Sequence, residues 1–119
     1  MKFEEMLQKA NTEFGMSQEK FINLQIACSE ALINAIVHGN KEQDNKQVYT
    51  EILFDHVFMS IRILDEGEGF DVKSVPDPTS GENLFKESGR GIYIIKSLVD
   101  EFECNSSSNG TEYILKVKK

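Results

Sequence analysis

The chain has 119 residues, which suits one domain spanning residues 1–119 around a single hydrophobic core. Its net charge of −7 and the lack of a long basic run argue against a nucleic-acid partner. No apolar run approaches the roughly 20 residues that span a bilayer, and Cys28 and Cys104 belong to no CxxC pair, so we expect no membrane contact and free thiols in a reducing cytoplasm.

The first half of the chain predicts two helices. Apolar residues recur at helical spacing over 2–14, and Gly15 is a plausible stop. Ser17 is a plausible N-cap for a second helix over 18–38, which Gly39 and Asn40 would close.

The second half predicts two β-hairpins separated by a loop and a helix. Period-2 alternation over 47–54 and 57–64 indicates the first hairpin, and 101–107 with 112–117 indicates the second across Asn109-Gly110. Residues 65–91 are rich in glycine, hold both prolines and read as a long functional loop, and 92–99 as a short helix. This order predicts an α+β fold, a two-layer sandwich of a mainly antiparallel sheet with helices on one face.

The second predicted helix carries Glu30, Asn34 and His38 at i, i+4 and i+8 among mostly apolar neighbours. Asparagine is an oxygen ligand suited to Mg²⁺ bridged to phosphates, and a glutamate one turn away can act as a general base in phosphoryl transfer. A solvated helix face or a polar cluster bonded within the core explains the same spacing.

The loop that begins at Asp65 reads DEGEGFD and follows a strongly apolar strand. Gly67 and Gly69 allow a close backbone approach to a ligand, and an aspartate at a strand end can accept a hydrogen bond from an exocyclic amine such as that of adenine. An acidic turn is the plainer alternative, and a calcium loop fits less well because the EF-hand ligand pattern is incomplete.

The segment Ser88-Gly89-Arg90-Gly91 is expected to open the short helix, where backbone N–H groups and the arginine would favour an anion such as phosphate. A flexible lead-in to a helix is the alternative. Gly110-Thr111 by itself indicates only hairpin chemistry. No Walker A loop or Rossmann fingerprint occurs in the chain.

Taken in order, ExxxNxxxH, DxGxGFD, GRGI and the late GT resemble the histidine-kinase-like ATPase superfamily of gyrases, heat-shock chaperones, histidine kinases and mismatch-repair ATPases. The likeness runs from about Phe21 to the C-terminus, and SGRGIYIIKSLVDEFE is most similar to the anti-sigma-factor serine/threonine protein kinases. The resemblance implies a Bergerat-type ATP-binding fold that uses ATP and Mg²⁺. It also implies a role for each matching position. Glu30 would be the general base and Asn34 the Mg²⁺ ligand, while Asp65 would bind the adenine amine, with Thr111 beside it and Gly67 and Gly69 in the pocket floor. Gly89, Arg90 and Gly91 would hold the phosphates, and residues 71–88 would form a lid over the nucleotide.

The same resemblance implies partners. The family's phosphoacceptor is a serine of a STAS-type anti-anti-sigma protein, its other partner is a sigma factor, and members generally form homodimers. A kinase of this type is the leading hypothesis. The alternative is a regulatory binding module that uses nucleotide as a conformational ligand with little phosphotransfer, and a structural domain without nucleotide would require every motif to be coincidental.

Overall fold

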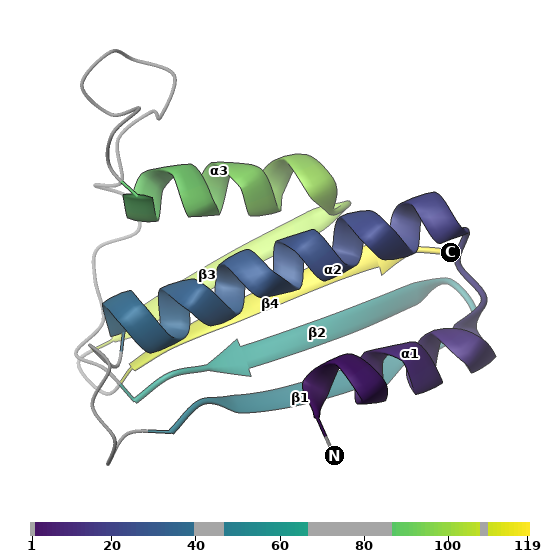
Figure 1. Cartoon of the computed structure of the whole chain (residues 1–119), viewed down its shortest axis with the longest axis horizontal. Helices are drawn as coiled ribbons and strands as arrows, with labels where there is room; N and C mark the ends of the chain where they lie inside the picture. The colour runs from purple at the N-terminus through teal and green to yellow at the C-terminus, as the bar shows by residue number, and fades with distance from the viewer. Residues whose placement is uncertain (1, 40–46, 67–86, 108–109) are drawn as a thin grey trace.

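The computed structural model describes residues 2–39, 47–66, 87–107 and 110–119, and it forms the expected α+β sandwich (Figure 1). The four strands make one sheet in the order β1-β2-β4-β3, with every neighbouring pair antiparallel. Within the described ranges, no helix has the length and apolar character needed to cross a membrane. The elements in chain order are α1 (Phe3–Phe14), α2 (Gln18–Ile33), the π-helical turn η1 (Asn34–Gly39), β1 (Tyr49–Phe54), β2 (Phe58–Leu64), α3 (Glu87–Leu98), β3 (Glu101–Ser107) and β4 (Gly110–Lys118).

The two predicted helix boundaries around residue 15 are confirmed. Gly15 adopts the left-handed conformation with φ 81°, and its N–H donates to the carbonyl oxygen of Asn11 at 2.8 Å. The Ser17 hydroxyl then accepts a hydrogen bond from the N–H of Lys20 at 3.3 Å. A glycine stop and a serine cap satisfy backbone groups that a helix end otherwise leaves without partners.

Helix α2 has one face in the core and another in solvent. Its core face is made of small or compact residues, which let the helix lie close to the sheet: Leu24, Ala27, Cys28 and Ala31. Its outer face carries a row of exposed isoleucines, which we call the isoleucine stripe: Ile22, Ile26, Ile33 and, at the start of η1, Ile36. Their spacing of 4, 7 and 3 residues keeps them on one side of a helix.

The predicted helix over 18–38 is wrong in its last turn. The α-helix ends at Ile33, and residues from Asn34 to Gly39 form the wider π-helical turn η1. π-Helical turns are rare and occur frequently at functional sites. The change falls on Asn34, one of the predicted site residues.

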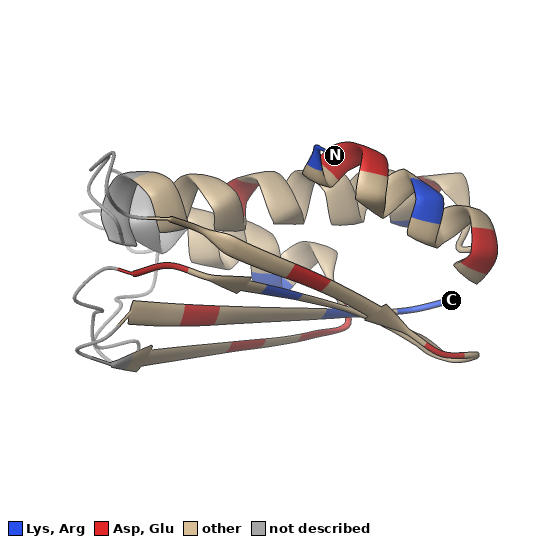
Figure 2. Ribbon diagram, turned by 90° about the horizontal axis from the view of Figure 1, so that it is seen from below, with Lys and Arg blue, Asp and Glu red and all other residues tan. Residues whose placement is uncertain are grey.

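The sheet turns one face toward the helices and the other away from them (Figure 2). On the helix side, alternate residues of β2 and β4 are buried, as period 2 requires. These residues are Met59, Ile61 and Ile63 on β2, and Thr111, Tyr113, Leu115 and Val117 on β4. On the opposite side the described elements leave the sheet face open (Figure 2). Arg62 and Glu112 alternate with the buried residues of β2 and β4, so their side chains lie on this open face.

Helix α3 begins at Glu87, five residues earlier than the predicted start at residue 92. Glycine weakens a helix, so the segment that holds Gly89 and Gly91 was expected to lead into the helix. The packing of α3 beside α2 in the helical layer overrides that local preference (Figure 1). Residues 67–86, which hold Gly67, Gly69 and most of the expected lid over 71–88, lie outside the described residues.

Candidate active site

Polar groups gather at one end of the sandwich, where η1, the start of α3, the end of β2 and the start of β4 meet (Figure 1). Within the described ranges, the buried polar or charged residues are Asn34, Asp65 and Thr111. All three are among the site residues predicted from the sequence. Burying polar side chains is unfavourable unless they form hydrogen bonds or bind a ligand, so their convergence makes this end the candidate functional site.

Asp65 and Thr111 are joined by reciprocal hydrogen bonds. The N–H of Asp65 donates to the carbonyl oxygen of Thr111, and the N–H of Thr111 donates to Oδ1 of Asp65, each at 3.0 Å. The hydroxyls of Thr111 and Ser106 lie 3.2 Å apart, within hydrogen-bonding distance. The end of β2 is therefore fixed to the start of β4, and the Asp65 carboxylate is held in one orientation beside a hollow of ≈ 300 Å³.

Gly110 allows this junction to form. It has φ 142°, and a β-carbon at this position would lie 2.1 Å from the carbonyl oxygen of Asp65. Only glycine permits so close an approach of the two backbones. The local pattern of Gly110-Thr111 indicated only hairpin chemistry, and the expectation that Thr111 lies beside Asp65 came from the family resemblance.

Asn34 and Gly91 bring two of the predicted motifs into contact. The Asn34 side chain is 3% exposed, and a β-carbon at residue 91 would lie 3.0 Å from its Nδ2 and 3.1 Å from its Oδ1. Gly91 therefore serves the site by leaving room for the carboxamide. Nδ2 of Asn34 is buried and has no hydrogen-bond partner in the part of the chain that the structure describes.

The position at which α3 begins determines which of its backbone N–H groups are available to bind an anion. The first four N–H groups of a helix have no intrahelical partner. Because α3 begins at Glu87, the amide of Gly89 is the last of that set, whereas the amides of Arg90 and Gly91 lie beyond it. The side chain of Arg90 is outside the described part of the chain.

Glu30 lies one turn before Asn34 on α2 and is half-buried, so its carboxylate retains access to solvent. The backbone of His38 is part of η1, but its side chain is not among those described. Among the described residues, no group of three or more His, Cys, Asp or Glu side chains forms a metal cluster. The carboxamide oxygen of Asn34 could hold a metal ion together with a ligand and water.

Comparison with known proteins decides the family. The family model for the histidine kinase-like ATPase domain matches residues 2–117. The serine-protein kinase RsbW of Staphylococcus aureus (strain MSSA476) is 32% identical over 115 residues, covering 86% of this chain and 71% of the relative. The corresponding protein of strain JH9 matches with the same identity and coverage. The chain belongs to the anti-sigma-factor kinase family of the histidine kinase-like ATPases.

The fold of this histidine kinase-like ATPase also matches solved structures. The histidine kinase domain of the blue-light-activated histidine kinase from Erythrobacter litoralis EL346 superposes with a TM-score of 0.60 at 18% identity, over 95% of this chain. The chain spans 61% of that domain and 39% of another solved chain of the same kinase. At this identity the likeness establishes the architecture, which agrees with the α+β sandwich described above.

Proposed function

We propose that this protein is an ATP- and Mg²⁺-dependent serine/threonine kinase that phosphorylates a serine of a STAS-type anti-anti-sigma protein and sequesters a sigma factor. The observation that carries the proposal is the burial of Asn34, Asp65 and Thr111 at one end of the fold. Two glycines, Gly91 and Gly110, leave room for this arrangement. The membership of the anti-sigma-factor kinase family supports the reaction class and the partners.

Asp65 is the proposed adenine ligand. Its carboxylate accepts one hydrogen bond from the Thr111 amide through Oδ1, which sets the direction of the side chain before a ligand arrives. A carboxylate accepts several hydrogen bonds, so capacity remains for the exocyclic amine of adenine. Thr111 acts by orienting Asp65.

Asn34 fits the Mg²⁺ role on the chemistry of its side chain and on its burial. The carboxamide is held at 3% exposure, and its oxygen is the atom that would bind Mg²⁺. Its buried nitrogen, which lacks a partner among the described residues, could donate a hydrogen bond to a phosphate oxygen of the ligand. Mg²⁺ is commonly held by one or two protein oxygens together with phosphates and water, and it would neutralise charge on the transferred phosphoryl group. The amide of Gly89, in the first turn of α3, would face the same phosphates.

Glu30 is the proposed general base, and its surroundings bear on the partner. The side chain is half-buried, so a serine hydroxyl from another protein can reach it. Its neighbours at i−4 and i+3 are Ile26 and Ile33, which are 44% and 43% exposed. A partner that delivers a serine to Glu30 would cover these apolar side chains, so the isoleucine stripe supports a protein substrate over a small molecule.

The test is phosphotransfer from labelled ATP to the STAS-type protein of the same organism. Glu30→Gln should retain ATP affinity and lose transfer by at least about a hundredfold, the range of general-base catalysis. Glu19→Gln, at an exposed position in the first turn of the same helix, is the matched control and should behave as wild type. Full transfer by Glu30→Gln would contradict the base assignment.

The second candidate is a nucleotide-dependent binding module with little phosphotransfer. The isoleucine stripe favours stable association whether or not chemistry follows. The same assay separates the two functions, because a stable complex without labelled serine would support the module. In both cases the proposed assembly includes a homodimer, which sedimentation of the purified chain would test.

A further inference from the structure

Tyr113 is a buried phenol beside the proposed adenine site. It follows Thr111 by two residues on β4, so the two side chains leave the same face of the sheet and point toward the helices. Tyr113 is 0% exposed, and its hydroxyl has no hydrogen-bond partner in the described part of the chain.

The neighbours of Tyr113 in the sheet are Ile63 on β2 and Cys104 on β3. Burial raises the pKa of Tyr113, and the nearby Cys104 and Asp65 raise it further. The phenol is therefore protonated at neutral pH and remains a donor. The carboxylate that we assign to adenine is bonded to the amide of Thr111, two residues before Tyr113 on β4, so both groups lie at the same end of the sheet.

A buried hydroxyl without a partner is unfavourable, and phenylalanine fills the same space without that cost. The side chains on either side of Tyr113 along β4, on the same face, are Thr111 and Leu115. Thr111 already has Ser106 within hydrogen-bonding distance, and leucine offers no acceptor. The acceptor for Tyr113 is therefore expected from a bound ligand at this end of the sandwich.

We propose that the Tyr113 hydroxyl recognises the adenine base by donating a hydrogen bond, directly or through one bound water, to a ring nitrogen of the base. This inference rests on the proposed nucleotide site. Adenine presents an amine, which Asp65 accepts, and ring nitrogens that are acceptors only, so a carboxylate and a phenol together match both kinds of group.

The experiment compares wild type with Tyr113→Phe by calorimetry with ATP and by thermal unfolding without ligand. Tyr113→Phe should weaken ATP binding by about tenfold, the worth of one buried hydrogen bond. The unfolding temperature without ATP should stay the same or rise, because no hydrogen bond within the described chain is lost. Tyr49→Phe, at an exposed position on β1, is the matched control.

Deaza analogues identify the base as the acceptor. The analogues 1-deaza-ATP, 3-deaza-ATP and 7-deaza-ATP each lack one of the three accepting ring nitrogens of adenine. With the analogue that lacks the nitrogen bonded by Tyr113, wild type and Tyr113→Phe should bind equally. A tenfold difference that persists with all three analogues would overturn the contact with the base. Unchanged ATP affinity in Tyr113→Phe would overturn this inference and leave the proposed function intact, whereas a wild-type chain that binds no ATP would contradict the proposed function itself.

Discussion

A β-carbon on residue 110 would lie 2.1 Å from the carbonyl oxygen of Asp65, so the two backbones touch where β4 begins and β2 has ended. This contact allows the paired hydrogen bonds between Asp65 and Thr111, each 3.0 Å long. The direction of the Asp65 carboxylate therefore depends on a residue that bears no functional group.

Replacing Gly110 with alanine should separate the two backbones. We expect the free energy of unfolding to fall by about 2–4 kcal/mol, because the new methyl group meets backbone and the φ of 142° disfavours any side chain. ATP affinity should fall with it as Asp65 turns away. Urea unfolding and calorimetry measure the two effects.

Gly15→Ala is the control for that experiment. Gly15 also has a positive φ, 81°, but the nearest atom to an added β-carbon is 4.0 Å away at the end of Lys119. The free energy of unfolding of Gly15→Ala should be about 1 kcal/mol lower than that of wild type, and its ATP affinity should be unchanged. Equal ATP affinities in the two variants would contradict the role given to Gly110.

Gly91→Ala tests the contact between α3 and η1. The new methyl group would lie 3.0 Å from Nδ2 of Asn34, so the carboxamide must move by a few tenths of an ångström. Alanine favours a helix by about 1 kcal/mol over glycine, which offsets part of the strain and keeps the overall stability within about 1 kcal/mol. We expect a roughly tenfold loss of ATP affinity in Mg²⁺ and little change without it.

Calorimetry with and without Mg²⁺ makes this measurement, and Ser97→Ala is its control on the exposed side of α3. Ser97 donates only within its own helix turn, to the carbonyl oxygen of Ile94. An Mg²⁺-dependent affinity in Gly91→Ala equal to that of wild type would remove Asn34 from the proposed metal role.

Local patterns predicted the sandwich and singled out two of its buried polar residues, but they could not predict their contacts. Helical spacing marked Asn34 as a polar position in an apolar helix, and the end of an apolar strand marked Asp65, whereas only the family resemblance implied a role for Thr111. The approach of Gly110 to Asp65 joins positions far apart in the chain and leaves no periodic signal. The π-helical turn at Asn34 likewise replaces α-helix where the sequence indicated no break.

Tyr113 is another residue whose place in the site the sequence pattern could not predict. In the sequence it is one more apolar position in an alternating strand, and its aromatic ring supports that interpretation. Only the structure shows that its hydroxyl is buried without a partner among the described residues. The cost of that burial depends on tertiary packing, which a strand pattern does not record.

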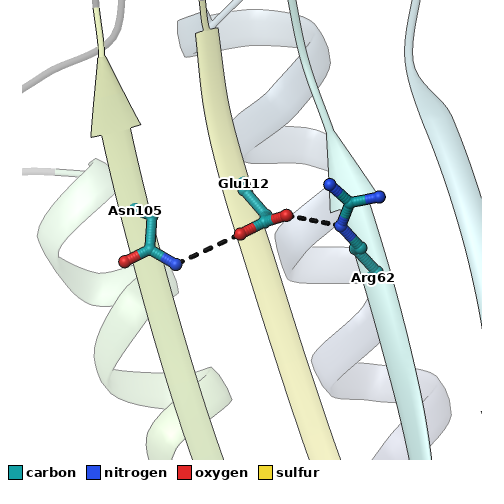
Figure 3. Close-up of polar contacts among 3 residues, drawn as sticks. All are labelled: Arg62, Asn105 and Glu112. Atoms are coloured by element: carbon teal, nitrogen blue, oxygen red, sulfur yellow. Dashed lines mark hydrogen bonds and ion pairs between the residues drawn. The ribbon is translucent and has the colours of Figure 1, made fainter.

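The open face of the sheet carries a polar network that predicts a pH effect on stability (Figure 3). Glu112 accepts hydrogen bonds from Arg62 on β2 and from Asn105 on β3, the latter at 3.2 Å. These two hydrogen bonds hold the pKa of Glu112 below its ordinary 4.5, and the one from Arg62 has the larger effect. The ionised Glu112 therefore stabilises the folded protein at pH values above its unfolded-state pKa. This stabilisation is lost as the pH falls through its folded-state pKa.

Arg62→Met should therefore cost stability at pH 7 and progressively less toward pH 3. Because the pair is partly exposed, we expect less than about 1 kcal/mol at pH 7. Lys116→Met removes the same charge from the same face and is the control. Urea unfolding at both pH values measures the difference, and a cost independent of pH would contradict the link to Glu112.

The two thiols should be poorly reactive in the folded protein. Burial raises the pKa of Cys28 to about 12, and burial followed by the charge of Asp65 raises that of Cys104 to about 12. The thiolate is the reactive form, so a disulfide reagent at pH 8 should label neither residue quickly. Labelling should accelerate in urea, and rapid labelling of Cys28→Ala in the native state would show that Cys104 is accessible and ionised.

The isoleucine stripe is the surface that we expect the protein substrate to cover when its serine reaches Glu30. Ile26 and Ile33 lie on either side of Glu30, and a lysine at either position would place a charge where a docked STAS-type protein needs apolar contact. Phosphotransfer to that protein should fall at least about tenfold in kcat/KM, while ATP affinity stays unchanged because neither side chain is in the nucleotide site. Val57→Lys, an exposed apolar residue beside the β1–β2 turn, is the control. Wild-type transfer by both Ile26→Lys and Ile33→Lys would show that the partner reaches Glu30 without covering the stripe.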